Sequence, residues 1–322
     1  MPCENLPNFH PRRPIFCLAF PDPDLAATLT ENINRRNNVA YSDNETAFTQ
    51  FEARRLSPAI GAELIGADLR NPTDALVSEV RAALLRYQVV FFRDQDITRQ
   101  QHIAFARKFG ELEIHPATPL EQPDREVLRI AHGPNSRGTE NSWHSDVTWR
   151  EAPSLGSILR AIELPEVGGD TLFSNMVMAY EDLDDGLKER LCQMTAVHDI
   201  ARVFAKRLKK DATELHAKYP PMEHPVIRTH PETGQRGLYV NTAFTDHIKG
   251  MDRKESDDLL KYLYSRAAIP EYQCRFRWAP GSLAFWDNRA CQHYAASDYF
   301  PNVRIMERVT IAGDRPYFNA AA

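Results

Sequence analysis

The sequence predicts a mainly β fold with covering α-helices, of the β-sandwich or jelly-roll type. Short apolar segments recur at hairpin spacing, with Gly and Pro residues between them. Residues 272–278 alternate apolar and polar side chains with a clean period of two, as a half-buried strand does. A few helical patterns lie before and between the strands, which fits helices that cover a sheet.

The composition is that of an ordinary globular protein. The 322 residues are 43% hydrophobic and 26% charged, which is enough for one large domain or two small ones. A formal net charge of -5 gives no general reason to expect binding to nucleic acid or to an anionic membrane. No apolar run is long enough to cross a bilayer, and residues 15–20 match a signal peptide poorly.

Cysteine usage indicates a reducing, cytoplasmic location. The number of cysteines is odd and no two form a C-x-x-C pair, so neither a disulfide framework nor a structural zinc site is expected. The five are Cys3, Cys17, Cys192, Cys274 and Cys291.

Residues 1–50 differ from the rest of the chain. They are rich in proline and then in polar residues, and we expect an irregular or partly disordered N-terminal extension. The regular domain is expected to span residues 51–322. Its first helix is predicted over residues 76–87, where apolar side chains recur at helical spacing, and residues 89–92 form a short buried strand.

The middle of the chain continues with helices and strands. Thr98 and Gln101 form a capping box that opens a second helix. Strands are then predicted at residues 127–130, 155–162 and 170–173. One helix is predicted at residues 178–194, and a partly helical, exposed stretch at residues 206–218.

The last third of the chain is predicted to be mostly strands. Residues 231–234 are a turn signal between two strands of a hairpin, and residues 252–268 form a helix. The remaining strands are expected at residues 272–278, 282–286 and 304–311.

A His-x-Asp pair, His144 and Asp146, is the first indication of chemistry. On an extended segment, residues i and i+2 point to the same face, so both side chains can reach one metal ion. His293, in a distant segment, would complete two imidazoles and one carboxylate, the ligand set of non-haem Fe(II) oxygenases. A pair of this kind is by itself a weak signal, since most are ordinary surface or hydrogen-bonded pairs.

Two arginines of the last strand point to anionic ligands. Arg304 and Arg308 share one strand face by the period of two. If that face is interior, each buried guanidinium needs an anion, and arginine binds carboxylate and sulfonate-like groups through paired hydrogen bonds. The alternative is an edge strand whose arginines lie in water.

The chain resembles the taurine dioxygenase (TauD/TfdA) family of Fe(II)/2-oxoglutarate-dependent dioxygenases. The resemblance extends from about residue 56 to about residue 316, and its motifs occur in the family's order. The matching segments are 143–148, 168–172, 224–231, 286–289, 292–295 and 304–310.

This resemblance implies a double-stranded β-helix (a jelly roll of the cupin type) and a set of site residues. His144, Asp146 and His293 would be the catalytic residues that ligate Fe(II). Thr171 and Arg304 would hold the cosubstrate 2-oxoglutarate, with O₂ as the second cosubstrate. The substrate pocket would be lined by His115, Val147, Phe204, Phe244 and Arg308.

The implied reaction is hydroxylation of taurine or another alkanesulfonate at the carbon next to sulfur. It would release sulfite, an aldehyde, succinate and CO₂. The sequence departs from the taurine pattern at Thr118 and Glu140, near the position of the taurine amine. This departure leaves room for other sulfonates and for alkyl sulfates, although Glu140 could also pair with an ammonium group.

Two further hypotheses stay open at this point. A family member acting on a carboxylate, such as an aryloxyalkanoate, would use Arg308 equally well. A jelly-roll binding protein without catalysis would have no need of a metal site with open positions. The expected partners are a small anionic substrate and other copies of the chain, as a dimer or tetramer, with no nucleic acid and no membrane.

Overall fold

The computed structural model describes residues 48–116, 118–208 and 211–321. Chain contacts divide the protein into two compact units, residues 1–38 and 39–322, and every described residue belongs to the second. The predicted N-terminal extension therefore lies almost wholly outside the described residues.

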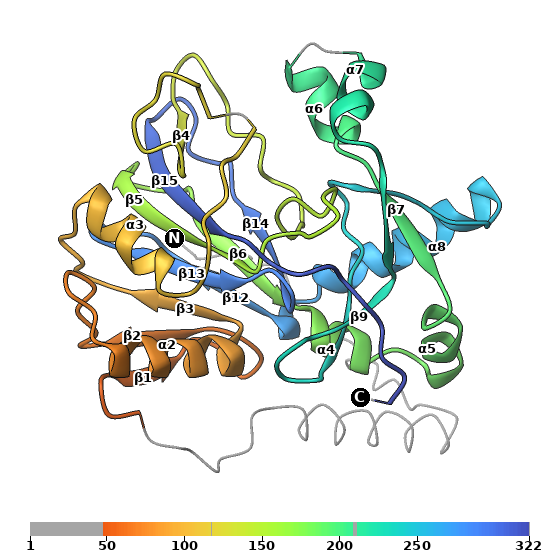
Figure 1. The fold of residues 1–322 in the computed structure, drawn as a ribbon, viewed down its shortest axis with the longest axis horizontal. Helices are drawn as coiled ribbons and strands as arrows, with labels where there is room; N and C mark the ends of the chain where they lie inside the picture. Colours follow the sequence, from red (N-terminus) through yellow and green to blue (C-terminus); the bar gives the residue numbers. More distant parts are fainter. Residues whose placement is uncertain (1–47, 117, 209–210, 322) are drawn as a thin grey trace, which may run out of the picture. The chain divides into compact units, whose positions relative to one another are not determined.

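A seven-stranded sheet is the largest element of the fold (Figure 1). Its order is β1-β2-β3-β13-β5-β15-β4, and all neighbouring strands are antiparallel except β2 and β3. Its strands are β1 (Glu52–Arg55), β2 (Ala62–Ile65), β3 (Val89–Phe92), β4 (Val127–His132), β5 (Gly156–Glu163), β13 (Leu283–Asp287) and β15 (Arg304–Ile311).

Two helices cover one face of this sheet. They are α2 (Asp74–Tyr87) and α3 (Arg99–Arg107), and the predicted capping box of Thr98 and Gln101 opens α3. Alternate residues of the strands, such as Phe92 and Phe285, pack against the apolar sides of both helices in one buried cluster. This burial explains why the spacing of apolar residues predicted α2 almost to its ends.

The opposite face packs against a second, three-stranded sheet of order β12-β6-β14. Its strands are β6 (Thr171–Asn175), β12 (Gln273–Phe276) and β14 (Cys291–Ala295). Phe91 of the large sheet stacks on Phe276 with ring centroids 4.1 Å apart, and it meets Phe173 edge-on. The structure thus confirms a mainly β core with covering helices, and the site lies between these two sheets.

The remaining elements surround this core. Two small antiparallel sheets contain β7 (Thr195–His198), β8 (Met222–Pro225) and β11 (Thr245–Ile248), and the predicted hairpin of β9 (Ile227–Thr229) and β10 (Arg236–Leu238). The helices are α4 (Met176–Glu181), α5 (Asp185–Leu191), α6 (Ala201–Leu208), α7 (Ala212–Lys218), α8 (Arg253–Ala267) and the 3-10 turn η1 (Pro270–Tyr272).

The single helix predicted over residues 178–194 is wrong. The chain forms α4 and α5 instead, because Asp184 accepts hydrogen bonds from the backbone of Gly186 and Leu187 and starts a new helix. Among the described helices, none is both long and apolar enough to span a membrane.

Candidate metal and anion site

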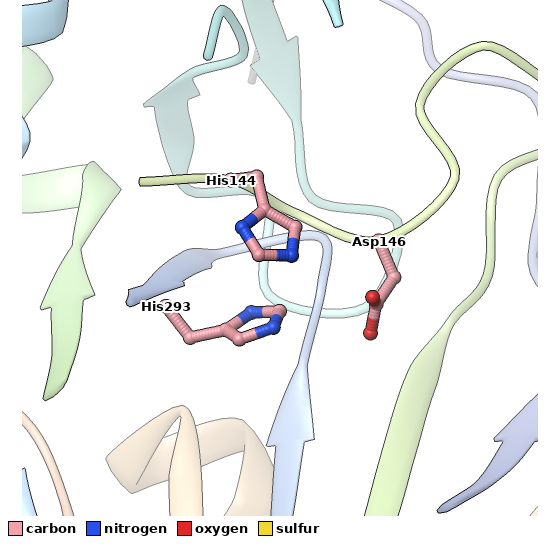
Figure 2. A group of neighbouring side chains, drawn as sticks. All are labelled: His144, Asp146 and His293. Carbon is pink, nitrogen blue, oxygen red and sulfur yellow. The ribbon is translucent and has the colours of Figure 1, made fainter. Parts of the chain in front are cut away.

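His144, Asp146 and His293 come together between the two sheets (Figure 2). One ligand atom from each lies within 4.8 Å of the others, and all three residues are buried. His144 and His293 form an isolated antiparallel bridge, in which each backbone N–H donates to the other residue's carbonyl at 3.1 and 2.8 Å. This bridge brings together two histidines that lie far apart in the sequence.

The local geometry differs from the extended segment that the sequence predicted. Of His144 and Asp146, only His144 pairs with another strand residue, His293. Asp146 lies at the start of a turn in which Val147 has a φ of 48°. The turn, rather than the two-residue period of a strand, directs the Asp146 carboxylate toward the imidazoles.

Three neighbours fix the Asp146 side chain and its backbone. Arg308 Nη1 donates to Oδ1 at 2.6 Å, and Ser157 Oγ donates to Oδ2 at 2.8 Å. The backbone N–H of Asp146 donates to Asn288 Oδ1 at 3.1 Å. Burial alone would raise the pKa of Asp146, but charge interactions, of which that with the Arg308 guanidinium is the largest, outweigh it and hold that pKa well below its ordinary value. The carboxylate is therefore ionised.

The two imidazoles can each offer a nitrogen donor to a metal ion. His144 Nδ1 lies 2.7 Å from the carbonyl of Ser142, so Nδ1 carries the hydrogen and Nε2 is left with its lone pair. Burial, followed by the nearby His144, lowers the pKa of His293 to about 3, and its buried Nδ1 has no hydrogen-bond partner. Two imidazoles and one carboxylate fit a divalent transition metal that keeps open positions.

Arg304 and Arg308 both point from β15 into this interior. Each is less than 10% exposed, and β15 lies between β4 and β5, so the edge-strand alternative is wrong. Arg304 Nε donates to the carbonyl of Gly169 at 3.1 Å, whereas its buried Nη2 has no hydrogen-bond partner. Among the described residues, Arg304 forms no salt bridge, and this arrangement suits an incoming carboxylate.

Gly169 allows Arg304 to lie where it does. Its φ is 73°, and a Cβ at this position would lie only 2.8 Å from Arg304 Cδ. A glycine is needed both for the backbone conformation and for the close approach of the arginine.

Thr171 is prepared to donate a hydrogen bond. Its hydroxyl oxygen accepts from Trp278 Nε1 at 3.0 Å, and an indole N–H can only donate. The Thr171 hydrogen is thus directed to a second partner. Trp278 also lies beside Arg304, with the guanidinium carbon 5.9 Å from the ring centroid. From the sequence alone, Trp278 is expected only to lie on the apolar side of a strand.

A cavity of about 360 Å³ opens beside the metal-site residues. All five residues that the resemblance placed in the substrate pocket line it: His115, Val147, Phe204, Phe244 and Arg308. Glu140 lines the same cavity, as does His132, which the sequence did not single out. Thr118 is buried but does not belong to the lining.

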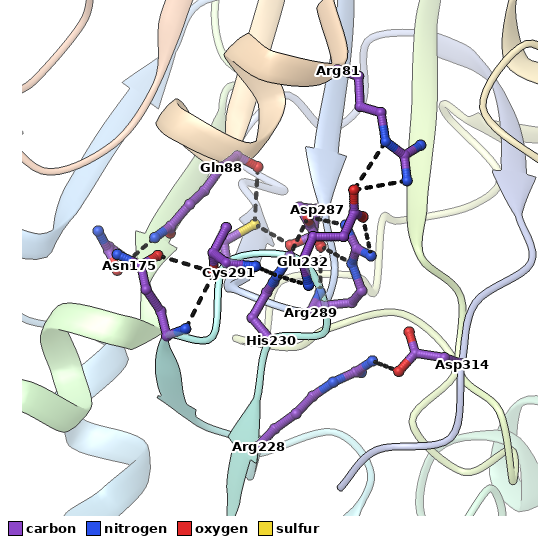
Figure 3. A network of polar contacts seen from close by, with 12 residues as sticks. Arg81, Gln88, Asn175, Arg228, His230, Glu232, Asp287, Arg289, Cys291 and Asp314 are labelled. Carbon is purple, nitrogen blue, oxygen red and sulfur yellow. Dashed lines mark hydrogen bonds and ion pairs between the residues drawn. The ribbon is translucent and has the colours of Figure 1, made fainter. Parts of the chain in front are cut away.

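A buried polar network supports the turn between β13 and β14 (Figure 3). Asp287 accepts two hydrogen bonds from the Arg289 side chain at 2.8 and 2.7 Å, and it lies 3.0 Å from His230 Nε2. Glu232 then joins Arg289 to Arg81 near the surface. Asn288, between the two charged residues, is the one that accepts the Asp146 backbone hydrogen bond. The network therefore connects the turn to the metal-site residues.

Comparison with known proteins gives one family. The model of the "Taurine catabolism dioxygenase TauD, TfdA family" matches residues 52–310. A Pseudomonas putida protein named alpha-ketoglutarate-dependent sulfate ester dioxygenase is 38% identical, covering 83% of this chain and 91% of that protein. An Acinetobacter baylyi protein named alkylsulfatase is 35% identical, and the match covers 82% of this chain and 86% of that protein.

The fold is also found among solved structures. A structure described as a taurine dioxygenase from Burkholderia xenovorans superimposes with a TM-score of 0.73 at 39% identity. The match covers 83% of this chain and 91% of that one.

Proposed function

The chain belongs to the TauD, TfdA family of alpha-ketoglutarate (2-oxoglutarate)-dependent dioxygenases, and from that premise we propose that it oxidises an organosulfur anion. The observation that carries this proposal is the pair of buried arginines, Arg304 and Arg308, on one face of β15 beside three metal-ligand side chains. Two cationic groups at one metal centre provide for two anions, one cosubstrate and one substrate.

The proposed reaction inserts one oxygen atom of O₂ into the C–H bond next to the sulfur-containing group. The other atom enters 2-oxoglutarate, which loses CO₂ and becomes succinate. The hydroxylated product of an alkanesulfonate such as taurine then breaks its C–S bond to give an aldehyde and sulfite. An alkyl sulfate breaks its C–O bond and gives an aldehyde and sulfate. The names of the relatives at 38% and 35% identity favour the sulfate ester as the first substrate to test.

His144, Asp146 and His293 would hold Fe(II), which supplies O₂ activation when bound. Ser157 and Arg308 keep the Asp146 carboxylate in its orientation, and the Ser142 carbonyl selects the His144 tautomer. The chain's own contribution at this point is to present three donors in a fixed, water-poor arrangement.

Arg304 and Thr171 would bind the distal carboxylate of 2-oxoglutarate. The Arg304 guanidinium has a buried Nη2 without a partner, and the Thr171 hydroxyl has a hydrogen to donate. Trp278 orients that hydroxyl by occupying its acceptor position.

Arg308 would hold the substrate anion at the cavity, with His115 beside it. Val147, Phe204 and Phe244 supply apolar walls that surround the organic part of the substrate and exclude water from the reacting carbon. The second candidate, a carboxylate substrate such as an aryloxyalkanoate, is supported by the fact that arginine binds both anions.

The other parts of the proposal concern the whole protein. The two packed sheets support a double-stranded β-helix, and residues 51–322 would form the catalytic domain. We propose a cytoplasmic enzyme that assembles as a homodimer or homotetramer and binds neither nucleic acid nor membrane.

A substrate panel tests the function. Protein loaded with Fe(II) and 2-oxoglutarate is given alkyl sulfates, alkanesulfonates, taurine and aryloxyacetates in air, and succinate, sulfate and sulfite are measured. Succinate together with sulfate or sulfite is the expected result. Succinate only with aryloxyacetates would move the proposal to the carboxylate class. No succinate above the substrate-free level with any of them would overturn it.

A further inference from the structure

An ion pair between Glu113 and Arg150 lies beside the substrate cavity and has no part in the proposed reaction. Arg150 Nη1 lies 2.6 Å from Glu113 Oε2, and the two side chains are 22% and 11% exposed. Ser154, a buried residue, donates from its Oγ to the same Oε2 at 2.9 Å. Because water reaches this pair poorly, its attraction is screened less than that of a fully exposed pair.

The His115 loop, residues 111–116, contains Glu113 two residues before His115. The Glu113 N–H donates to a backbone carbonyl of β15 at 2.9 Å, which fixes the first half of the loop to the large sheet. Arg150 Nη2 donates to the carbonyl of Ile114 at 3.4 Å. One guanidinium therefore holds both the Glu113 side chain and the backbone immediately before His115.

The Asp146 turn ends at Arg150. The Arg150 N–H donates to the Val147 carbonyl at 2.9 Å, and the Arg150 carbonyl accepts from His224 Nε2 at 2.9 Å. Both backbone polar groups of Arg150 are thus held, and its side chain extends from this fixed point to the His115 loop. Asp146, Val147 and His115 line the same cavity, so the ion pair joins two walls of one site.

We propose that Arg150 and Glu113 are positioning residues for the substrate anion. Their ion pair fixes the His115 loop against the Asp146 turn, so that His115 and Arg308 face one ligand. A loop that is already ordered loses less conformational entropy when the anion binds, and the anion then binds more tightly. A buried ion pair often contributes little net stability, which leaves the fixing of one chain arrangement as its role here. This inference rests on the proposed function, since it concerns the substrate anion of the same site.

Removal of the guanidinium tests the inference. In Arg150→Met, the dissociation constant of propyl sulfate should rise about tenfold, measured by anaerobic calorimetry on protein loaded with Fe(II) and 2-oxoglutarate. Propane-1-sulfonate or phenoxyacetate replaces propyl sulfate if the parent protein binds one of them more tightly. The constants for 2-oxoglutarate and Fe(II) should not change, because the side chains that would hold them are fixed by other contacts. An unchanged constant for the anion, or an equal rise for 2-oxoglutarate, would overturn the inference.

The partner residue and a neighbouring exposed ion pair supply the controls. Glu113→Ala should produce the same rise, and the double variant with Arg150→Met should bind the anion no more weakly than the weaker single variant, because the two residues act as a unit. Additive effects would overturn the inference. Glu151→Gln removes an ion pair with Arg315 at 3.4 Å, in which the arginine is 73% and the glutamate 67% exposed. It should leave all three constants unchanged, and a rise equal to that of Arg150→Met would also overturn the inference.

Two conservative variants cover a failure of Arg150→Met to fold. Arg150→Lys keeps a positive charge beside Glu113, whereas Glu113→Gln keeps the shape of the side chain but leaves only a neutral acceptor. Arg150→Lys is therefore expected to bind the anion more tightly than Glu113→Gln does. Equal binding by the two variants, or the reverse order, would overturn the inference.

Hydrogen exchange reports on the His115 loop without any substrate. In Arg150→Met, or in Glu113→Gln if the former does not fold, the backbone amides of residues 111–115 should exchange faster than in the parent protein. Those of β6, which carries Thr171, should exchange at the parent rate. Unchanged exchange in the His115 loop would overturn the inference. Faster exchange in a protein whose parent turns over none of the anions tested would reject the proposed function alone, so the two failures are distinguishable.

Discussion

The contact between Trp278 and Thr171 is a residue-scale feature with a measurable effect. Replacing Trp278 by Phe keeps the aromatic ring against Arg304 but removes the donor to the Thr171 hydroxyl. A neutral hydrogen bond contributes about 0.5–1.5 kcal/mol, so the KM for 2-oxoglutarate should rise about 2- to 12-fold while kcat changes little.

The double variant Trp278→Phe with Thr171→Val provides the control. If Trp278 acts through the hydroxyl, it should weaken 2-oxoglutarate binding little more than Thr171→Val alone. Additive effects would mean that Trp278 contributes in another way, for example by packing on Arg304.

The two arginines of β15 should separate kinetically. Arg308→Ala is expected to raise the KM for the organosulfur anion about 10- to 100-fold, the loss of a charge-assisted hydrogen bond, with a smaller effect on 2-oxoglutarate. Arg304→Ala should show the reverse pattern. Steady-state kinetics with each substrate varied in turn measures both, and equal effects on the two KM values would mean that the assigned roles are wrong.

At the scale of elements, the turn between β13 and β14 depends on its buried charges. Arg289→Ala would leave the buried Asp287 with His230 as its remaining side-chain partner and should lower the free energy of unfolding by about 3–5 kcal/mol. Arg81→Ala removes an ion pair between partly exposed side chains on the same Glu232, and it should cost less than about 1 kcal/mol. Urea unfolding of the two variants measures the difference, and similar losses would contradict this account of the network.

At the scale of the whole molecule, buried neutral histidines should make stability depend on pH. Burial is the largest cause that lowers the pKa of His102 to about 3 and that of His224 to about 4, from 6.5. The folded pKa lies below the unfolded value, so the unfolded chain binds more protons at acidic pH. Stability is then fully present above about pH 6.5 and is lost as the pH falls toward 4.

Urea titrations of the metal-free protein between pH 7.5 and pH 5 measure this dependence. The free energy of unfolding should fall by about 1–3 kcal/mol per pH unit below pH 6.5, and His102→Gln should reduce that slope. A flat profile down to pH 5 would show that these imidazoles are protonated in the folded protein.

Much of the site could be predicted because its signals are local. The spacing of Arg304 and Arg308 placed both on one strand face, and the structure shows that face to be interior. The family resemblance is confirmed by the match over residues 52–310, and the five residues predicted for the substrate pocket line one cavity. Strand periodicity is a property of neighbouring residues, and the order of motifs follows the chain itself, so both can be read before the fold is known.

The sequence by itself determined which residue types are present for the chemistry: His144, Asp146 and His293 for a metal, and two arginines for anions. Only the tertiary structure decided how they are held. The turn at Asp146, the Trp278 donor to Thr171 and the pairing of Glu140 with His132 all depend on the packing of two sheets or on the path of a loop. A charge in the sequence has no partner until the fold supplies one, and for Glu140 the fold supplies His132.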